Sequence, residues 1–202
     1  AVDACINGRI LNAGQSCIAA KRCLVNGVIF DEFIDIVKQK MSSFVLGDPF
    51  GALSTCGPLA RADLQRSVQQ QLERGLALDG KLLFEQKSDF QQGYFVCPSL
   101  IEVDSTANPL FQEEVFGPIL PVKRFDALAD GLRDANASLF GLGASVWGES
   151  RQTAYFCREI AAGMVAVNQM MASVFDRPFG GIKASGYGKE LGLDGIESFV
   201  NK

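Results

Sequence analysis

Short apolar runs of β type alternate with amphipathic helical stretches along most of the chain, and this alternation restricts the fold more than any other feature. Strands are predicted at residues 22–29, 82–84, 119–125, 143–147 and 164–167. Helices are predicted at residues 1–11, 31–47, 61–75, 126–135 and 150–161. Strands joined by helices pair in parallel through right-handed crossovers, and the helices cover both faces of the sheet. The sequence therefore predicts an α/β fold, a three-layer, mainly parallel, doubly wound sheet, with its site at the carboxyl ends of the strands.

Capping residues, proline and glycine give more detailed predictions for a few segments. Asp31 is predicted to cap the helix that ends at Gly47, and Gly75 is predicted to end the following helix. Residues 93–101 carry a proline within an apolar run, which favours an edge or bulged strand. Residues 179–192 are rich in glycine but match no phosphate-binding motif, so a packing or substrate-lining loop is favoured.

Length and charge limit the class of protein. A chain of 202 residues can bury one core, so residues 1–202 are predicted to form a single domain. The net charge is −4, and the basic residues are interspersed with acidic ones, so no surface for nucleic acid is predicted. The sequence has no apolar run of about 18 residues and no basic leader before an apolar stretch, so neither membrane insertion nor export is predicted.

The six cysteines and the absence of histidine limit the chemistry further. The cysteines form no Cys-x-x-Cys pair, and three of them lie in apolar segments, which is typical of a protein of the reducing cytoplasm. Without histidine, the chain cannot by itself form a Cys-His hydrolase site, a Ser-His-Asp triad or a His-ligated zinc site. No metal site is predicted.

Residues 12–17, with the sequence Asn-Ala-Gly-Gln-Ser-Cys, form a polar loop of small residues that ends on Cys17. Backbone N–H groups and amide side chains near a thiol favour the thiolate, which is the reactive form of cysteine. Cys17 is therefore a candidate nucleophile. The alternative is a small apolar cysteine packed between structural elements, which is the commoner role of a single cysteine.

Three separated segments, taken together, resemble the aldehyde dehydrogenase superfamily in their order and spacing. Residues 12–17 resemble the cysteine signature of that family. Residues 113–118, Glu-Glu-Val-Phe-Gly-Pro, resemble its cofactor motif, and Asn168 together with residues 178–186 resembles its closing loop. Residues 17–22 and 178–191 are similar in particular to those of bacterial succinate-semialdehyde dehydrogenases.

The resemblance implies that the protein oxidises an aldehyde to the carboxylic acid, with NAD or NADP as cofactor. Cys17 would attack the aldehyde and form a thiohemiacetal and then a thioester, which water hydrolyses. The backbone N–H of Cys17 and an amide side chain would bind the oxyanion. Glu114 would bind the ribose hydroxyls of the nicotinamide, and Phe116 would form an apolar wall beside it. The alternatives are a solvated acid for Glu114 and a core aromatic residue for Phe116.

The same resemblance implies that Ser16, Ile18, Ser173 and Phe179 line the path of the aldehyde. Asn168 would contact the substrate from the end of the preceding strand. Packing in the core is an equal alternative for Phe179, and stabilisation of a turn is an equal alternative for Asn168.

The sequence also departs from the family. Its members carry an N-terminal dinucleotide-binding domain, which supplies the oxyanion asparagine and the general-base glutamate, and a C-terminal strand used in oligomer assembly. This sequence ends at Asn201-Lys202 and has neither, so it is predicted to be the catalytic domain alone and inactive in isolation. The full-length enzyme is predicted to be a homo-oligomer. Some succinate-semialdehyde dehydrogenases have an arginine six residues before the cysteine, where this chain has Leu11. A substrate carboxylate would then be bound by Arg177 or by the missing domain.

Two other functions stay open at this point. The chain could be a noncatalytic folding or interaction unit, or a relative of the acyl-phosphate and acyl-CoA reductases that share the fold. Residues 114–118 favour aldehyde oxidation over the reductases. NAD and NADP are not distinguished, because the group that recognises the 2′-phosphate belongs to the dinucleotide-binding domain. The expected partner is a small aldehyde.

Overall fold

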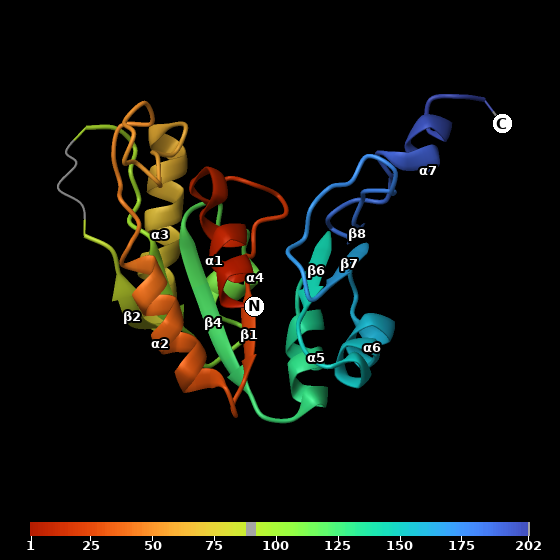
Figure 1. Ribbon diagram of the computed structural model, residues 1–202, viewed down its shortest axis with the longest axis horizontal. Helices are drawn as coiled ribbons and strands as arrows, with labels where there is room; N and C mark the ends of the chain where they lie inside the picture. The colour runs from red at the N-terminus through yellow and green to blue at the C-terminus, as the bar shows by residue number, and fades with distance from the viewer. Residues whose placement is uncertain (88–91, 202) are drawn as a thin grey trace. The chain divides into compact units, whose positions relative to one another are not determined.

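The computed structural model describes residues 1–87 and 92–201, and the chain forms two compact units. Residues 2–131 make up the first unit, and the chain from Leu132 onward makes up the second. Figure 1 shows the helices and strands of each unit. Among the described residues, no helix is both long and apolar enough to cross a membrane.

The first unit is built on a four-stranded sheet. Its strands are β1 (Cys23–Asn26), β2 (Lys81–Glu85), β3 (Ser99–Glu102) and β4 (Ile119–Phe125). They lie in the order β1-β4-β3-β2, with β4 parallel to both β1 and β3, and β2 antiparallel to β3. The helices of this unit are α1 (Val2–Ile10), the 3-10 helix η1 (Leu11–Gly14), α2 (Phe30–Met41), α3 (Ala62–Leu78) and α4 (Pro109–Gln112).

The core of the first unit lies on both faces of this sheet. Leu100 and Ile101 are neighbours in β3 and both are fully buried, and the same is true of Ile119 and Leu120 in β4. Successive side chains of a strand point to opposite faces, so each face of the sheet must be covered. The predicted α/β fold with a mainly parallel sheet is confirmed.

The second unit contains two pairs of strands. Strands β6 (Gly143–Val146) and β7 (Met164–Val167) are parallel, and α6 (Ser150–Glu159) connects them. Strands β5 (Phe140–Gly141) and β8 (Ile182–Lys183) are antiparallel. Helix α5 (Leu128–Asn136) begins in the first unit and ends in the second, and α7 (Gly192–Glu197) follows β8. The strand–helix–strand order predicted for this part of the chain is confirmed.

The prediction of an edge or bulged strand at residues 93–101 is wrong. The strand begins only at Ser99, and β3 lies between β4 and β2. Proline has no backbone N–H, but Pro98 precedes the strand, so the sheet loses no hydrogen bond. The edge position belongs to β2, whose pairing with β3 shifts in register between Leu82 and Phe84.

Two predicted helix ends also differ from the structure. Asp31 does not cap α2 but lies in its first turn, where a carboxylate interacts favourably with the helix dipole, and α2 ends well before Gly47. Helix α3 continues past Gly75. This glycine permits close helix packing instead, because a Cβ atom on Gly75 would lie 2.6 Å from Cγ of Leu110 in α4.

Candidate active site

The loop at residues 12–17, here called the cysteine loop, has an unusual backbone. Asn12, Ala13 and Gly14 have φ angles of 54°, 53° and 76°, so three consecutive residues are left-handed. This conformation is unfavourable for residues other than glycine and persists only where surrounding contacts impose it. The cysteine loop is therefore held in place by its neighbours.

The amide side chains of the loop provide part of that support. Asn12 Nδ2 donates to the carbonyl of Gln15, and Gln15 Nε2 donates to the carbonyl of Asn12, each at 3.1 Å. Gln15 Oε1 also accepts from the backbone N–H of Ala60 at 2.9 Å. The amides that we expected to assist the thiol thus bind backbone groups, and they stabilise the loop conformation.

Cys17 lies at the exposed end of this loop. It is exposed, whereas Cys56 is buried and the other four cysteines are half-buried. Ser16 and Ile18, which flank it, are half-buried. Within residues 1–87 and 92–201, no group accepts a hydrogen bond from the backbone N–H of Cys17. This N–H group is therefore available to a ligand oxygen close to the thiol.

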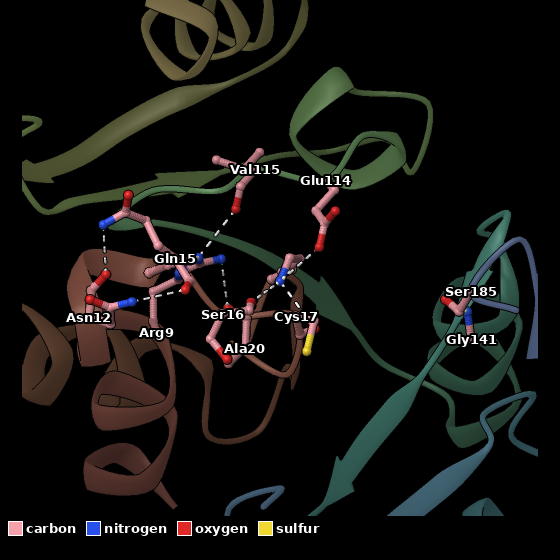
Figure 2. A network of polar contacts seen from close by, with 12 residues as sticks. Arg9, Asn12, Gln15, Ser16, Cys17, Ala20, Glu114, Val115, Gly141 and Ser185 are labelled. Atoms are coloured by element: carbon pink, nitrogen blue, oxygen red, sulfur yellow. Dashed lines mark hydrogen bonds and ion pairs between the residues drawn. The ribbon is translucent and has the colours of Figure 1, made fainter. Parts of the chain in front are cut away.

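Arg9 joins the cysteine loop to segment 113–118. Its side chain is completely buried, and Nη2 donates to the carbonyls of Gly14 at 2.8 Å and Val115 at 3.2 Å. Nη1 donates to the carbonyl of Ala20 at 3.3 Å. Figure 2 shows Arg9 between these three segments. Burial lowers the pKa of Arg9 to about 10, against the opposing effects of Cys5 and Glu114, so the guanidinium is charged at neutral pH.

The two segments also touch through their backbones. A Cβ atom on Gly14 would lie 2.3 Å from the carbonyl oxygen of Gly117, so only glycine fits at this point of the cysteine loop. Two of the three predicted motifs are thus packed directly against each other, although Gly14 and Gly117 are far apart in sequence.

Lys21 connects the backbone of the cysteine loop with the side chains of segment 113–118. Its Nζ atom donates to the carbonyl oxygens of Ser16 at 2.6 Å and Cys17 at 3.2 Å, and it forms an ion pair with Glu114 Oε1 at 3.2 Å. The same atom lies 5.1 Å from the centroid of the Phe116 ring, within the range of a cation–π contact. Lys21 therefore brings the candidate nucleophile and both predicted cofactor residues into one cluster.

Glu113 anchors the segment from the opposite side. Its carboxylate accepts two hydrogen bonds from Arg74 of α3, at 2.6 and 2.7 Å, and one from Gln71 Nε2 at 3.1 Å. Gln71 Nε2 also donates to the carbonyl of Glu114 at 3.2 Å. The hydrogen bonds from Arg74 lower the pKa of Glu113. Glu113 is therefore bound to α3, whereas Glu114 faces the cysteine loop.

The remaining predicted residues lie in the second unit. Ser173 and Phe179 line one hollow of about 300 Å³, together with Arg177 and Met170. Asn168 follows β7 with a φ angle of 53°, and its amide makes two hydrogen bonds with the backbone of Gly148, at 2.9 and 3.0 Å. These bonds fit the turn-stabilising alternative for Asn168. Contact of the three predicted residues with a substrate stays a prediction.

Arg9 and Lys21 were not identified from the sequence. Lys21 stands four residues after Cys17, and a cation so close to a candidate nucleophile was a usable signal. Arg9 gave no such signal, since a single arginine in a helix normally reaches solvent.

Iodoacetamide is expected to label Cys17 at least roughly tenfold faster than any other cysteine of the folded protein, because alkylation needs an accessible thiol. Burial raises the pKa of Cys56 to about 11, and a 3.7 Å hydrogen bond between the half-buried thiols of Cys5 and Cys23 raises the pKa of Cys23. That hydrogen bond lowers the pKa of Cys5, so Cys5 is the expected second site. Peptide mass spectrometry over a time course measures each rate.

The control is the same reaction in concentrated urea, where all six thiols are exposed and the rates should converge. Equal labelling of the six cysteines in the folded protein would contradict an accessible reactive site at Cys17.

The model of the aldehyde dehydrogenase family matches residues 1–202. The NADP(+)-dependent succinate-semialdehyde dehydrogenase 1 of Mycobacterium tuberculosis is 38% identical over 202 residues, which is 100% of this chain and 44% of that protein. Succinic semialdehyde dehydrogenase from Streptococcus pyogenes, solved with NADP+, has a TM-score of 0.94 and 31% identity over 100% of this chain and 44% of its own. Betaine aldehyde dehydrogenase from Staphylococcus aureus, solved with NAD+, has a TM-score of 0.93 and 28% identity over 98% of this chain and 40% of its own. The chain thus spans less than half the length of these relatives.

Proposed function

Because the chain belongs to the aldehyde dehydrogenase family, we propose that it is the cysteine-bearing part of an enzyme that oxidises an aldehyde to the carboxylic acid. The observation that carries this proposal is the cluster around Lys21, in which the loop of the exposed Cys17 lies against Glu114 and Phe116. An exposed thiol whose loop is linked through Lys21 to a carboxylate and an aromatic ring suits a reaction that needs both a nucleophile and a bound nicotinamide.

In the proposed reaction, the Cys17 thiolate adds to the carbonyl carbon of the aldehyde, and the carbonyl oxygen becomes an oxyanion. The backbone N–H of Cys17, which has no hydrogen-bond acceptor within the part of the chain that the structure describes, is one donor for that oxyanion. Loss of hydride from the thiohemiacetal carbon re-forms the carbonyl as a thioester on Cys17. Water then attacks the thioester and releases the carboxylic acid and the thiol.

The residues of segment 113–118 fit a nicotinamide cofactor. The Glu114 carboxylate is 45% exposed and has one oxygen paired with Lys21, so the group can still accept hydrogen bonds from ribose hydroxyls. Phe116 offers a half-buried ring beside it. NAD or NADP, when bound, accepts the hydride. The relatives named above bind one or the other, and we propose the same choice for this protein.

The full-length relatives are longer than this chain, and we propose that residues 1–202 act as a catalytic domain within a longer, homo-oligomeric polypeptide. The general base and the second oxyanion donor would come from outside these residues, so residues 1–202 alone are expected to show no turnover. The six cysteines are free thiols. This fits our proposal of a cytoplasmic enzyme.

For the substrate we propose succinate semialdehyde, the substrate named for the mycobacterial and streptococcal relatives. It carries a carboxylate at the end opposite to the aldehyde, and a protein normally binds such a group with arginine. Arg177 is the candidate, because it lines the same hollow as Ser173 and Phe179. The polypeptide encoded by the full gene, tested with a panel of aldehydes and with each cofactor, provides the test.

Replacing Arg177 by methionine is expected to raise the KM for succinate semialdehyde roughly tenfold to a hundredfold, the usual effect of losing a hydrogen bond to a charged group. The KM for propanal, which has no carboxylate, is expected to stay within about twofold. Arg151→Met, on the exposed start of α6, is the matched control. Equal effects on both aldehydes would contradict carboxylate binding by Arg177.

The panel of aldehydes also distinguishes the proposed enzyme from a noncatalytic unit and from an acyl-phosphate or acyl-CoA reductase. A noncatalytic unit would produce no reduced cofactor with any aldehyde, even as the full-length polypeptide. An acyl-phosphate or acyl-CoA reductase would need phosphate or coenzyme A for aldehyde oxidation, whereas the proposed enzyme needs only water.

A further inference from the structure

Lys21 has a more specific arrangement than a lysine at a protein surface. A lysine ammonium has three N–H donors, and Lys21 has three acceptors within hydrogen-bond distance: the carbonyls of Ser16 and Cys17 and the carboxylate of Glu114. Only 17% of its side chain is exposed, against 45% for Glu114. The ammonium therefore has its full hydrogen-bonding capacity committed to the cysteine loop and to segment 113–118.

A second cation, Arg9, and the Glu114 carboxylate both influence the Lys21 ammonium. Burial lowers the pKa of Lys21, and the nearby Arg9 lowers it further, whereas Glu114 raises it. Glu114 also raises the pKa of Arg9, so one carboxylate favours the charged form of both cations. Burying a second cation beside a first is unfavourable unless its contacts are specific.

We propose that Lys21 is a positioning residue that fixes the Glu114 carboxylate for the cofactor ribose and, with the same ammonium group, fixes the backbone on either side of the Cys17 peptide. This inference rests on the proposed function for its kinetic consequence. A half-exposed glutamate with no cation beside it samples several rotamers, whereas an ion pair with a buried lysine selects one of them. In the same way, the hydrogen bonds from Lys21 to the carbonyls of Ser16 and Cys17 select one conformation of the cysteine loop.

The arrangement makes the two halves of the site depend on each other. If Lys21 leaves the carbonyls of the loop, it also leaves Glu114, because a single Nζ atom makes all these contacts. Loss of the Glu114 charge should likewise loosen the cysteine loop, although Glu114 itself is far from that loop in sequence. A merely structural lysine would not give this reciprocal effect.

The test uses Lys21→Met, which keeps the length of the side chain and removes its charge, and Lys21→Arg, which keeps the charge. Lys81→Met is the matched control, because the exposed Lys81 of the edge strand β2 forms an ion pair with the half-buried Glu102, at 3.9 Å. In the full-length enzyme, Lys21→Met is expected to raise the KM for the nicotinamide cofactor roughly tenfold and to leave the KM for the aldehyde within about twofold. Lys21→Arg should restore most of the loss, and Lys81→Met should change neither constant.

A double-mutant cycle tests whether Lys21 acts through Glu114. Glu114→Gln is expected to raise the cofactor KM by a similar factor, and Lys21→Met with Glu114→Gln should be little worse than either change alone. If the cofactor KM of the double variant rises by the product of the two single effects, the proposal is overturned. Equal cofactor KM values in Lys21→Met and in an active wild-type enzyme would also overturn it, as would an arginine variant as impaired as the methionine variant.

Hydrogen exchange gives a measurement that does not depend on turnover. Amides in residues 16–20 are expected to exchange faster in Lys21→Met and also in Glu114→Gln, and to be unchanged in Lys81→Met. If the wild-type enzyme oxidises no aldehyde but this pattern is found, the proposed function fails and the positioning role stands. Unchanged exchange in Lys21→Met would overturn the positioning role even in an active enzyme.

Discussion

Replacing Cys17 by serine is expected to lower the kcat of the full-length enzyme for aldehyde oxidation by at least about a thousandfold. A serine hydroxyl is almost entirely protonated at neutral pH, and it becomes an effective nucleophile only beside a general base. Residues 1–202 contain no histidine that could act as that base. Cys17 is exposed, so the free energy of unfolding should change by less than about 0.5 kcal/mol.

Single-turnover kinetics with a saturating cofactor measures the loss directly, since it isolates the formation of reduced cofactor from the release of product. Cys157→Ser is the matched control, because Cys157 is a half-buried thiol on α6 that has no part in the proposed reaction. Its kcat should stay near that of the wild type. A Cys17→Ser enzyme that keeps a tenth of its activity would place the nucleophile elsewhere.

The candidate site residues that the sequence singled out in the first unit are those whose chemistry depends on residue type. A thiol, a carboxylate and an aromatic ring are recognisable in the sequence, and the structure brings Cys17, Glu114 and Phe116 around Lys21. The α/β fold was predictable for a similar reason, because the alternation of strand and helix periods is a property of side-chain type and order.

Arg9 shows what such patterns cannot reveal. Its three acceptors are main-chain carbonyls, and every residue type carries a carbonyl, so nothing in the sequence marks Gly14, Ala20 and Val115 as partners. The loop conformation that turns these carbonyls toward Arg9 exists only in the folded chain. A buried arginine satisfied by backbone groups therefore looks, in the sequence, like a solvated one.

The errors in the fold have the same origin. Gly75 was expected to end a helix, because a glycine is a weak helix former whatever its surroundings. Its actual role depends on Leu110, which packs where a Cβ atom would be. Pro98 was expected to mark an edge or bulged strand. It lies just before β3, where the sheet needs no N–H group from it. The role of Gly75 is decided by a neighbour in the folded chain, and that of Pro98 by its place one residue before the strand.

Replacing Arg9 by methionine is expected to destabilise the first unit by about 2–4 kcal/mol. Three carbonyls lose their donor, and each buried carbonyl left without a partner costs about 1–3 kcal/mol. Part of this cost is offset, because the variant no longer buries a charge or the Arg9 Nε atom, which has no hydrogen-bond partner within the described residues. Methionine fills a similar volume, so the loss of the hydrogen bonds should dominate over any cavity.

The midpoint of urea unfolding measures the global effect, and the rate of Cys17 alkylation reports on the loop, which should be reached more easily in the variant. Arg61→Met is the matched control, since Arg61 forms an exposed ion pair with Asp63, and its loss should cost less than about 1 kcal/mol. Arg9→Lys, which keeps a charge but offers fewer donors, should lie between the wild type and Arg9→Met, and it serves where the methionine variant does not fold. An Arg9→Met protein with the wild-type midpoint and the wild-type alkylation rate would mean that the left-handed turn at residues 12–14 holds the cysteine loop without Arg9. Lys21 and the Gly14–Gly117 packing would then suffice to link the two family segments.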